Sequence, residues 1–372
     1  MVRTRKVFQT RRPTTSPLMS NALYLGDCVE VLSSLPSGIG DLFYVDPPFF
    51  SNRNYFANAG KPNQRKIFTD CWVGGLDEYC QWMESLLVQC RRVIKESGSM
   101  YLHCDQHASH YVKVLLDKIF GYENFRNEII WKRQNAHNDW SQGARHFGRI
   151  HDVLFFYSAS EDYAWNPVFV PYDEHYVERT YRHLENATGR YYALGDLSGP
   201  GGASKGNPRF TFLGATRNWR YSQEKMQKLL EAGRIVQTSQ DTVPKLKRYL
   251  DEMNGTQVQD MWDDIKPVNR GGEKLGYPTQ KPCRLLERII SASSNRGDVL
   301  IDPLFGSGTS LLTASKLGRR WIGIDSSTYA CNLTRRRLER AGVEPVIVQN
   351  LDQQVSTQAI DTVRQLSRTR AQ

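Results

Sequence analysis

The feature of this sequence that most limits its fold is the alternation of short apolar strands with amphipathic helices along most of its 372 residues. Residues 41–45 form an apolar run typical of a buried strand, and apolar residues recur at helical spacing over 76–96. This alternation is typical of a doubly wound α/β fold, in which helices cover both faces of a mostly parallel sheet. We expect strands at 21–27, 41–45, 100–103, 127–131, 153–157, 299–302 and 321–325, and helices at 28–35, 76–96, 107–119, 282–294, 309–317 and 328–341.

The composition of the chain changes in its middle. Residues 132–275 hold one more apolar strand, at about 150–158, but are otherwise rich in Asn, Gln, Arg, Trp and Tyr and contain the glycine-rich loop 198–206. Such a segment has the composition of a surface-reading insertion more than of a core. We therefore expect five parts: a flexible basic arm (1–20), one half of the α/β core (21–131), the insertion together with the last core strand (132–275), the other half of the core (276–345) and a C-terminal tail (346–372).

The chain carries a net charge of +10. Excess Lys and Arg can neutralise phosphates and release counterions, so the charge is compatible with a polyanionic partner, although ordinary surface charge would account for it as well. No stretch approaches the roughly 18 uninterrupted apolar residues of a membrane span, and the basic N-terminus lacks the apolar run of a secretory signal. We expect a soluble, cytoplasmic protein.

The 7 cysteines are scattered and include no CxxC pair, which argues against a disulfide framework and against a zinc ribbon. We interpret them as reduced thiols. His103, Cys104, His107 and His110 form the one cluster that suggests a metal site, but they follow the apolar pair Tyr101-Leu102. A strand end and a helix start explain this cluster better, so we expect no metal.

Asp46-Pro47-Pro48-Phe49 follows the predicted strand 41–45, at the strand end where open α/β sheets place their ligands. One reaction that this motif could serve is alkylation of an exocyclic base amine, which is a poor nucleophile because its lone pair is delocalised into the ring. The Asp46 carboxylate and the Pro47 carbonyl could accept both amine hydrogens and offset the positive charge that develops on alkylation. The two prolines fix the backbone without adding N–H donors, and Phe49 offers a stacking face worth roughly 1–3 kcal/mol. For this motif alone, a proline-rich turn without function is the alternative.

A glycine-rich turn, Asp302 to Ser310, lies between a predicted strand and a predicted helix. Gly306 and Gly308 allow close backbone approach to a ligand, and the N–H groups of the helix start favour an anionic group such as a carboxylate. The turn lacks the third spaced glycine of the dinucleotide fingerprint and the Gly-Lys-Ser/Thr ending of a phosphate-binding loop. Hydride transfer and nucleotide hydrolysis are therefore disfavoured.

Two charged residues accompany this turn. Asp325 ends the next strand, about 20 residues on, where an acidic side chain can accept both hydroxyls of a ribose. Lys281, in the segment Tyr277 to Pro282, precedes the helix that leads to the glycine turn and could balance a carboxylate. Taken singly, Asp325 is better explained as a helix cap and Lys281 as a solvated lysine.

The motifs DPPF, YPTQKP, DPLFGSGTS and IGID, in this order and spacing, resemble those of the DNA amino-methyltransferases of the β arrangement. In that arrangement the catalytic segment comes first, a target-recognition region follows and the cofactor-binding segment comes last. The resemblance covers about residues 21–341. It implies a Rossmann-like, seven-stranded, mostly parallel sheet, S-adenosylmethionine as cofactor and a target base flipped out of the duplex. It makes 21–131 the catalytic half, 132–275 the region with the target-recognition insertion and 276–345 the cofactor-binding half.

The resemblance also implies roles for individual residues. The catalytic segment is Asp46, Pro47, Pro48 and Phe49, with the flipped base held by Asp46, Pro47 and Phe49. The cofactor-binding residues are Phe305, Gly306 and Gly308 at the methionine end, Asp325 at the ribose, Thr279 and Lys281 on the carboxylate side, Asp27 and Cys28 at the adenine, and Asp302, Ser307, Thr309 and Ser326 within the same segments.

Aspartate as the first residue of the tetrapeptide favours adenine N6, because family members acting on cytosine N4 usually carry serine there. Cytosine N4 and adenine in RNA are the alternatives. Pro282-Cys283 could suggest a cysteine nucleophile for cytosine C5, but proline is simply favoured at a helix start. A binding module without catalysis is disfavoured because the catalytic and cofactor motifs are both intact.

The expected partner is double-stranded DNA, with a separately encoded cognate restriction endonuclease as a further candidate. We expect a monomer or homodimer, associated with the nucleoid of a prokaryote or acting in a virus-infected host. The chain shows no obvious nuclease motif, so we expect methylation without cleavage. Phe50 and Tyr55 are candidates to assist Phe49 in stacking the base. Candidates for reading base edges are Arg133, Gln134, Asn135, Asn138, Gln142, Arg217, Asn218, Arg220, Lys245 and Lys247.

Overall fold

The computed structural model describes residues 21–57, 64–135, 143–237, 239, 242–268 and 272–348. The expected basic arm (1–20), the candidate base readers Asn138 and Gln142, and residues 349–372 of the expected tail lie outside these ranges. The chain divides into two compact units, Met1–Asn166 with Gln259–Gln372, and Pro167–Val258. Among the described residues, no helix has the length and apolar character needed to cross a membrane.

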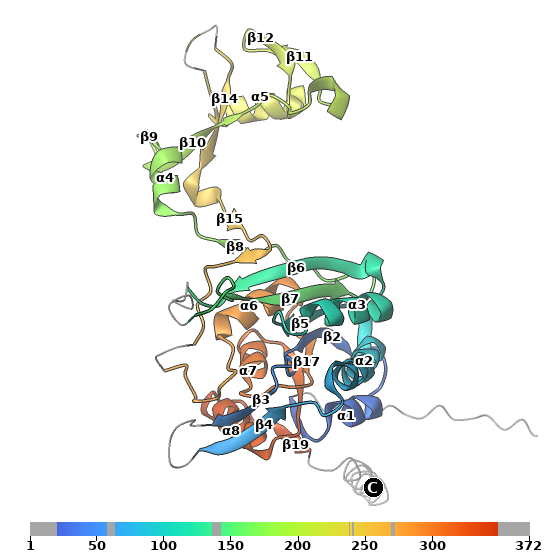
Figure 1. Cartoon of the computed structure of the whole chain (residues 1–372). Coiled ribbons are helices and arrows are strands. Elements are labelled where there is room, and N and C mark those ends of the chain that lie inside the picture. Colours follow the sequence, from blue (N-terminus) through green and yellow to red (C-terminus); the bar gives the residue numbers. More distant parts are fainter. Residues whose placement is uncertain are drawn as a thin grey trace, which may run out of the picture. The chain divides into compact units, whose positions relative to one another are not determined.

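A nine-stranded sheet organises the first unit, in the order β16-β6-β7-β5-β2-β17-β18-β1-β19 (Figure 1). β7 runs antiparallel to its neighbours β5 and β6, and the other paired strands of this sheet are parallel. The mostly parallel α/β fold is therefore confirmed. The strands are β1 Ala22–Leu25, β2 Gly40–Val45, β5 Ile94–Cys104, β6 Phe125–Lys132, β7 His151–Ser158, β16 Met261–Trp262, β17 Val299–Asp302, β18 Arg320–Asp325 and β19 Val346–Val348.

Helices cover both faces of this sheet, as Figure 1 shows. On one face, buried residues such as Leu32, Leu86 and Leu116 pack against Phe43 and Ile324 of the sheet. The alternation of strand and helix along the chain therefore translates into two packed layers around the sheet. The helices are α1 Cys28–Ser34, α2 Gly75–Val93 and α3 Ser109–Phe120 on that face, followed by the short 3-10 helix η1 Tyr122–Asn124, and α6 Cys283–Ala292, α7 Thr309–Lys316 and α8 Thr328–Arg340 on the other.

The structure corrects three details of the sequence prediction. The sheet has nine strands where seven were expected, because β16 and β19 are edge strands too short to show an alternating pattern. The helix expected over 76–96 ends at Val93, because Ile94 is extended and pairs with Gly40 of β2. The hairpin formed by β3 Arg53–Ala57 and β4 Arg65–Asp70 was not predicted.

The second unit, Pro167–Val258, lies within the segment in which an insertion was expected. Its small core contains Leu197, Phe212, Trp219, Met226 and Leu246. A four-stranded sheet, β13-β14-β10-β9, and two antiparallel pairs make up its strands. The elements are β8 Phe169–Val170, α4 Glu174–Thr180, β9 His183–Glu185, β10 Arg190–Asp196, η3 Gly202–Lys205, β11 Arg209–Phe212, β12 Ala215–Asn218, α5 Gln223–Glu231, β13 Ile235–Val236, β14 Lys245–Tyr249, η4 Leu250–Glu252 and β15 Thr256–Gln257.

Candidate active site

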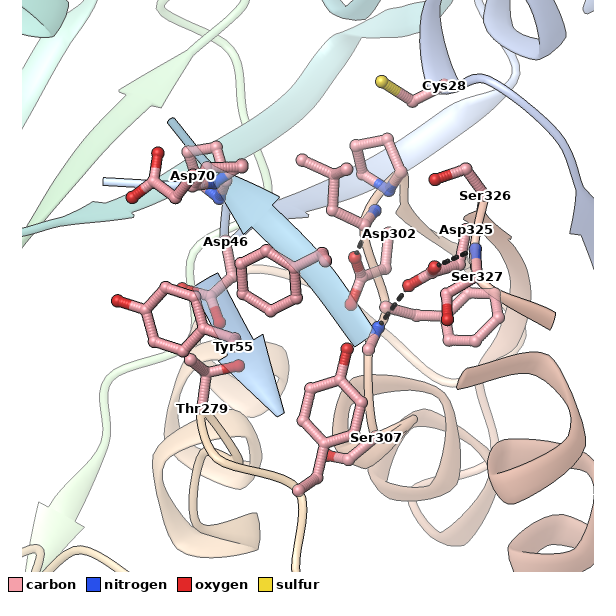
Figure 2. Close-up of a pocket in the computed structure, with 18 of the residues that line it drawn as sticks. Cys28, Asp46, Tyr55, Asp70, Thr279, Asp302, Ser307, Asp325, Ser326 and Ser327 are labelled. Carbon is pink, nitrogen blue, oxygen red and sulfur yellow. Dashed lines mark hydrogen bonds between the residues drawn. The ribbon is translucent and has the colours of Figure 1, made fainter. Parts of the chain in front are cut away.

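A cavity of about 290 Å³ opens where the parallel strands β2, β17 and β18 end. Residues that follow these strands in sequence line it, so its position agrees with the strand-end rule for α/β sheets. Figure 2 shows Asp46, Tyr55, Asp70 and Thr279 on one side of the cavity, and Cys28, Asp325, Ser326 and Ser327 on the other. We call these the tetrapeptide side and the glycine-turn side.

The structure brings together at this cavity almost all the residues that the sequence pointed to. Of the predicted catalytic and cofactor-binding residues, only Gly308 does not line it. Of the two candidates to assist Phe49 in stacking, Tyr55 lines the cavity and Phe50 does not. The lining also includes residues that were given no role from the sequence: Tyr44, Phe68, Thr69, Asp70, Trp72, Trp82, Tyr277, Leu286, Pro303, Leu304, Ser310 and Ser327. Of these, Tyr277, Pro303, Leu304 and Ser310 stand inside the quoted motifs, which is a signal that could have found them.

Asp46 begins the tetrapeptide after β2, and its carboxylate is held by Lys281. Lys281 Nζ donates to Asp46 Oδ1 at 2.7 Å and to Asp46 Oδ2 at 2.6 Å. Both side chains are largely buried, with 10% of Lys281 and 17% of Asp46 exposed. Charge-assisted bonds to both oxygens fix the orientation of the carboxylate. The sequence had suggested a cofactor carboxylate as the partner of Lys281, whereas its partner in this structure is Asp46.

Phe49, the last residue of the tetrapeptide, lies against His103. The two rings stack with their centroids 5.7 Å apart and an interplanar angle of 24°. His103 is fully buried, and its Nδ1 lies 3.1 Å from the Tyr44 hydroxyl. No group of three or more His, Cys, Asp or Glu among the described residues could hold a metal ion. His103, one of the residues that had suggested a metal site, supports the ring of Phe49 through the stacking contact.

Asp152 of β7 continues this buried polar chain. Its Oδ2 lies 3.2 Å from His103 Nε2, and its Oδ1 accepts a hydrogen bond from Arg133 Nε at 2.6 Å. Burial alone would raise the pKa of Asp152, but the hydrogen bond and charge of His103, together with Arg133, hold that pKa below its usual range. Arg133, a candidate for reading base edges, is thus engaged with a buried carboxylate.

On the glycine-turn side, the turn between β17 and α7 is tied to Asp325 at the end of β18. Gly306 N–H donates to Asp325 Oδ2 at 2.9 Å, and Ser327 N–H donates to Asp325 Oδ1 at 2.8 Å. Gly306 has a φ of 52°, and a Cβ built on it would lie 3.1 Å from the ring of Tyr277. A side chain would therefore narrow the cavity at this point, which explains the glycine.

Two carboxyl groups on this side have raised pKa values. Asp302 is 2% exposed and accepts hydrogen bonds from Leu304 N–H at 3.0 Å and from the Ser310 hydroxyl. Burial raises the pKa of Asp302 to about 7, although these two hydrogen bonds oppose the rise. Burial also raises the pKa of Asp325 to about 6, although the hydrogen bonds that it accepts from two backbone N–H groups oppose the rise. Both groups therefore titrate close to neutral pH.

Two of the predicted cofactor residues have local structural explanations. A side chain at Gly308, whose φ is 72°, would collide with Thr334, so packing requires glycine there. Asp27 is the N-cap of α1, and its Oδ1 accepts from Val29 N–H at 2.9 Å and from Glu30 N–H at 3.1 Å. Asp27 also lines the cavity, so the capping contact holds its carboxylate at the cavity wall.

Comparison with known proteins identifies the family. The model of the N6_N4_Mtase family, described as DNA methylase, matches residues 40–336. The chain therefore belongs to this family of DNA methylases. The resemblance to DNA methyltransferases is confirmed, and the β arrangement of the motifs stays a prediction.

Individual relatives agree with this family. The chain is 28% identical over 300 residues to the type II methyltransferase M.EcaI of Enterobacter cloacae, with 80% of this chain and 64% of that protein covered. It thus spans less than two thirds of that relative. It is 24% identical over 330 residues to the DNA adenine methyltransferase YhdJ of Escherichia coli K12, with 88% and 86% covered. A putative DNA modification methylase of Thermus thermophilus, solved with S-adenosyl-L-methionine, aligns with a TM-score of 0.47 at 17% identity, covering 89% and 98%.

Proposed function

We propose that this chain is a DNA methyltransferase that transfers the methyl group of S-adenosylmethionine to N6 of a flipped-out adenine. The observation that carries the proposal is the convergence of Asp46-Pro47-Pro48-Phe49 and the Gly306 turn on one cavity. A site that places an amine-holding motif beside a cofactor-binding turn suits direct transfer of the methyl group from the cofactor to the amine.

On the tetrapeptide side, the Asp46 carboxylate and the Pro47 carbonyl accept the two hydrogens of the base amine. This localises the nitrogen lone pair and offsets the positive charge that develops as the N–C bond forms. A carboxylate has about four lone-pair sites, so Asp46 can accept from the amine while it keeps a bond to Lys281. The Phe49 ring, supported by His103, offers the stacking face for the base.

On the glycine-turn side, the residues fit S-adenosylmethionine, the cofactor of the family. Gly306 leaves room that a Cβ would fill, and the oxygens of Asp325 keep lone pairs for ribose hydroxyls beyond the two N–H groups they accept. Asp302 supplies negative charge beneath the turn, which suits a cationic ligand. When bound, the cofactor supplies an electrophilic methyl group on a sulfonium. We assign cofactor contacts to Asp27, Cys28, Thr279, Asp302, Phe305, Gly306, Ser307, Thr309, Asp325 and Ser326.

The choice of adenine rests on Asp46 as the first residue of the tetrapeptide and is supported by the relative named as an adenine methyltransferase. Cytosine N4 is the second candidate, because the family model covers both amines. The two bases present a similar exocyclic amine to Asp46, so the same residues would act on either. The difference between them is the size of the ring that must fit beside Phe49.

We assign double-stranded DNA as the polymer, with the second unit as its target-recognition part. Arg217 and Arg220 are exposed there and fit contacts to phosphates or base edges. Two other candidates are paired within the unit, Lys245 with Asp196 at 2.6 Å and Lys247 with Glu185 at 2.6 Å. Under this proposal the protein acts inside the cell, as a monomer or homodimer, with a separately encoded restriction endonuclease as a candidate partner.

Product analysis tests the proposed base. Methylation-free genomic DNA is incubated with the chain and S-adenosylmethionine, digested to nucleosides and analysed by mass spectrometry. N6-methyladenine is the expected product. N4-methylcytosine would keep the mechanism and overturn the base, and a matched digest of methylation-free RNA shows whether DNA is the preferred polymer.

A further inference from the structure

Asp70 is a buried carboxylate in the wall of the cavity that the proposed reaction does not use. It is the last residue of β4 and is 1% exposed. Its Oδ1 accepts from Phe50 N–H at 3.2 Å and from Trp72 Nε1 at 2.8 Å. Its Oδ2 accepts from Ser51 N–H at 2.7 Å and from Ser51 Oγ at 2.6 Å. Four donors therefore converge on one side chain, and three of them belong to the two residues after the tetrapeptide.

The turn that Asp70 holds has an unfavourable backbone conformation. Phe50 has a φ of 59° and Asn52 a φ of 54°, which place two non-glycine residues in the left-handed region. This region is unfavourable for a bulky residue such as Phe50, which adopts it only where its surroundings fix it, whereas Asn52 tolerates it better. The turn follows Phe49 directly, so its geometry sets the direction in which the chain leaves the tetrapeptide.

The same network reaches a second aromatic ring in the cavity wall. Ser51 Oγ lies 3.0 Å from the Tyr55 hydroxyl. The Tyr55 ring stacks on the Phe68 ring with centroids 4.6 Å apart. Phe68 belongs to β4, so this strand of the hairpin holds the Tyr55 ring in place. Tyr55 and Asp70 lie on the side of the cavity where Asp46 lies (Figure 2). The aromatic wall of the tetrapeptide side is therefore built by the β3–β4 hairpin as well as by Phe49.

We infer that Asp70 is a positioning residue for the target base. It orients Phe49 through the turn 50–52, and through Ser51 it orients Tyr55, which contacts the base as a second aromatic face. The inference deepens the proposed function and rests on it. Asp70 touches neither the reacting amine nor the methyl donor, so its effect passes through the two rings.

Single-turnover methyl transfer to methylation-free genomic DNA tests this role. The variants are Asp70→Asn, Tyr55→Ala and their combination. Asp298→Asn is the matched control, because Asp298 also accepts a backbone N–H, from Asn295 at 2.6 Å, and does not line the cavity. Calorimetric titration with S-adenosylmethionine and thermal melting accompany each rate.

Asp70→Asn should slow transfer by about 100-fold, the scale of an ångström-sized misplacement, with cofactor affinity within about twofold of the unmodified chain. Because part of the effect of Asp70 passes through Tyr55, the double variant should be slower than Tyr55→Ala by less than 100-fold, and the remaining loss is the part that passes through Phe49. A purely structural role would give independent, multiplicative losses and would lower cofactor affinity as well, and that result would overturn the inference.

Ser51→Ala keeps the test decisive if Asp70→Asn does not fold. It removes the hydroxyl between Asp70 and Tyr55 and leaves the bonds from the backbone of 50 and 51. About a tenfold loss of transfer rate is expected, and an unchanged rate overturns the inference. If the unmodified chain and all the variants transfer methyl at the same rate, the positioning role of Asp70 is refuted and the proposed function is not. No transfer by the unmodified chain refutes the proposed function as well.

Discussion

The ammonium group of Lys281 donates to both carboxylate oxygens of Asp46, at 2.7 and 2.6 Å, across 235 residues of sequence. The pair joins the segment before the α6 helix to the tetrapeptide after β2. The residue proposed to hold the base amine is thus fixed by the half of the chain that is expected to bind the cofactor. Assembly of the two halves of the fold is therefore a condition for an ordered Asp46 carboxylate.

This pair predicts an asymmetric effect on stability. Lys281→Met leaves a largely buried carboxylate without its cation and should lower the free energy of unfolding by about 3 kcal/mol. Adding Asp46→Asn should restore much of that loss, because the unpaired charge disappears. Denaturant unfolding measures both, with Lys316→Met, an exposed lysine of α7, as the control. Equal losses in the single and double variants would contradict the role of the pair.

The raised pKa of Asp302 predicts that cofactor affinity depends on pH. The carboxyl group, with a pKa of about 7, is largely ionised at pH 8 and largely protonated at pH 6. A cationic ligand favours the ionised form, so the affinity for S-adenosylmethionine should fall by about tenfold from pH 8 to pH 6, with Asp325 adding to the fall at its lower end. Calorimetry at these pH values measures it. Asp302→Asn should remove most of this pH dependence, and the control Asp298→Asn should retain it. An affinity of the unmodified chain that does not change with pH would contradict the proposed effect of the Asp302 charge on cofactor binding.

The shape of the glycine turn predicts a selective loss of cofactor binding. Gly306→Ala places a methyl group 3.1 Å from the Tyr277 ring, in a residue with a φ of 52°. Gly342→Ala imposes a similar backbone cost at a φ of 76°, with nothing within 4 Å. Both variants should lose about 1 kcal/mol of stability, but only Gly306→Ala should weaken S-adenosylmethionine binding. Equal affinities in the two variants would show that the turn does not meet the cofactor.

Arginine residues in the two units should differ in what they do. Arg133→Ala removes the partner of buried Asp152 and should lower the melting temperature, with little change in the salt dependence of DNA binding. Arg217→Ala removes an exposed charge and should leave the melting temperature unchanged. It should weaken binding to duplex DNA and reduce the salt slope by about one, the expectation for one phosphate contact. Fluorescence anisotropy over a salt series distinguishes the two outcomes, and a reduced slope in Arg133→Ala would overturn this division.

The main fold was predictable because its signals are local. The runs 41–45, 299–302 and 321–325 are apolar, bounded by turns and close to the observed β2, β17 and β18. The motif residues follow directly from these strand ends, so the parallel sheet brings them together. The edge strands β16 and β19 and the helix end at Val93 depend on pairing with distant strands, which no local pattern reveals.

Residues that support the site were harder to predict, because their roles exist only in the folded chain. His103 belongs to β5 and stacks on Phe49, which follows β2. Asp70 holds Phe50 and Ser51, which lie 20 and 19 residues before it in the sequence. In the sequence alone, a histidine at a strand end and an aspartate after a threonine carry no distinctive pattern. Lys281 was singled out from the sequence and lines the cavity, but its contact with Asp46 required the structure.

The most direct test of the account is transfer of tritiated methyl from S-adenosylmethionine to methylation-free duplex DNA by the unmodified chain and by Asp46→Ala, with calorimetric binding of the cofactor measured for both. The account predicts label in DNA with the unmodified chain, in N6-methyladenine, and loss of label in Asp46→Ala while cofactor binding persists. Transfer by Asp46→Ala at the unmodified rate would contradict the assignment of the catalytic residue. No transfer by the unmodified chain with cofactor bound would contradict the proposed function itself.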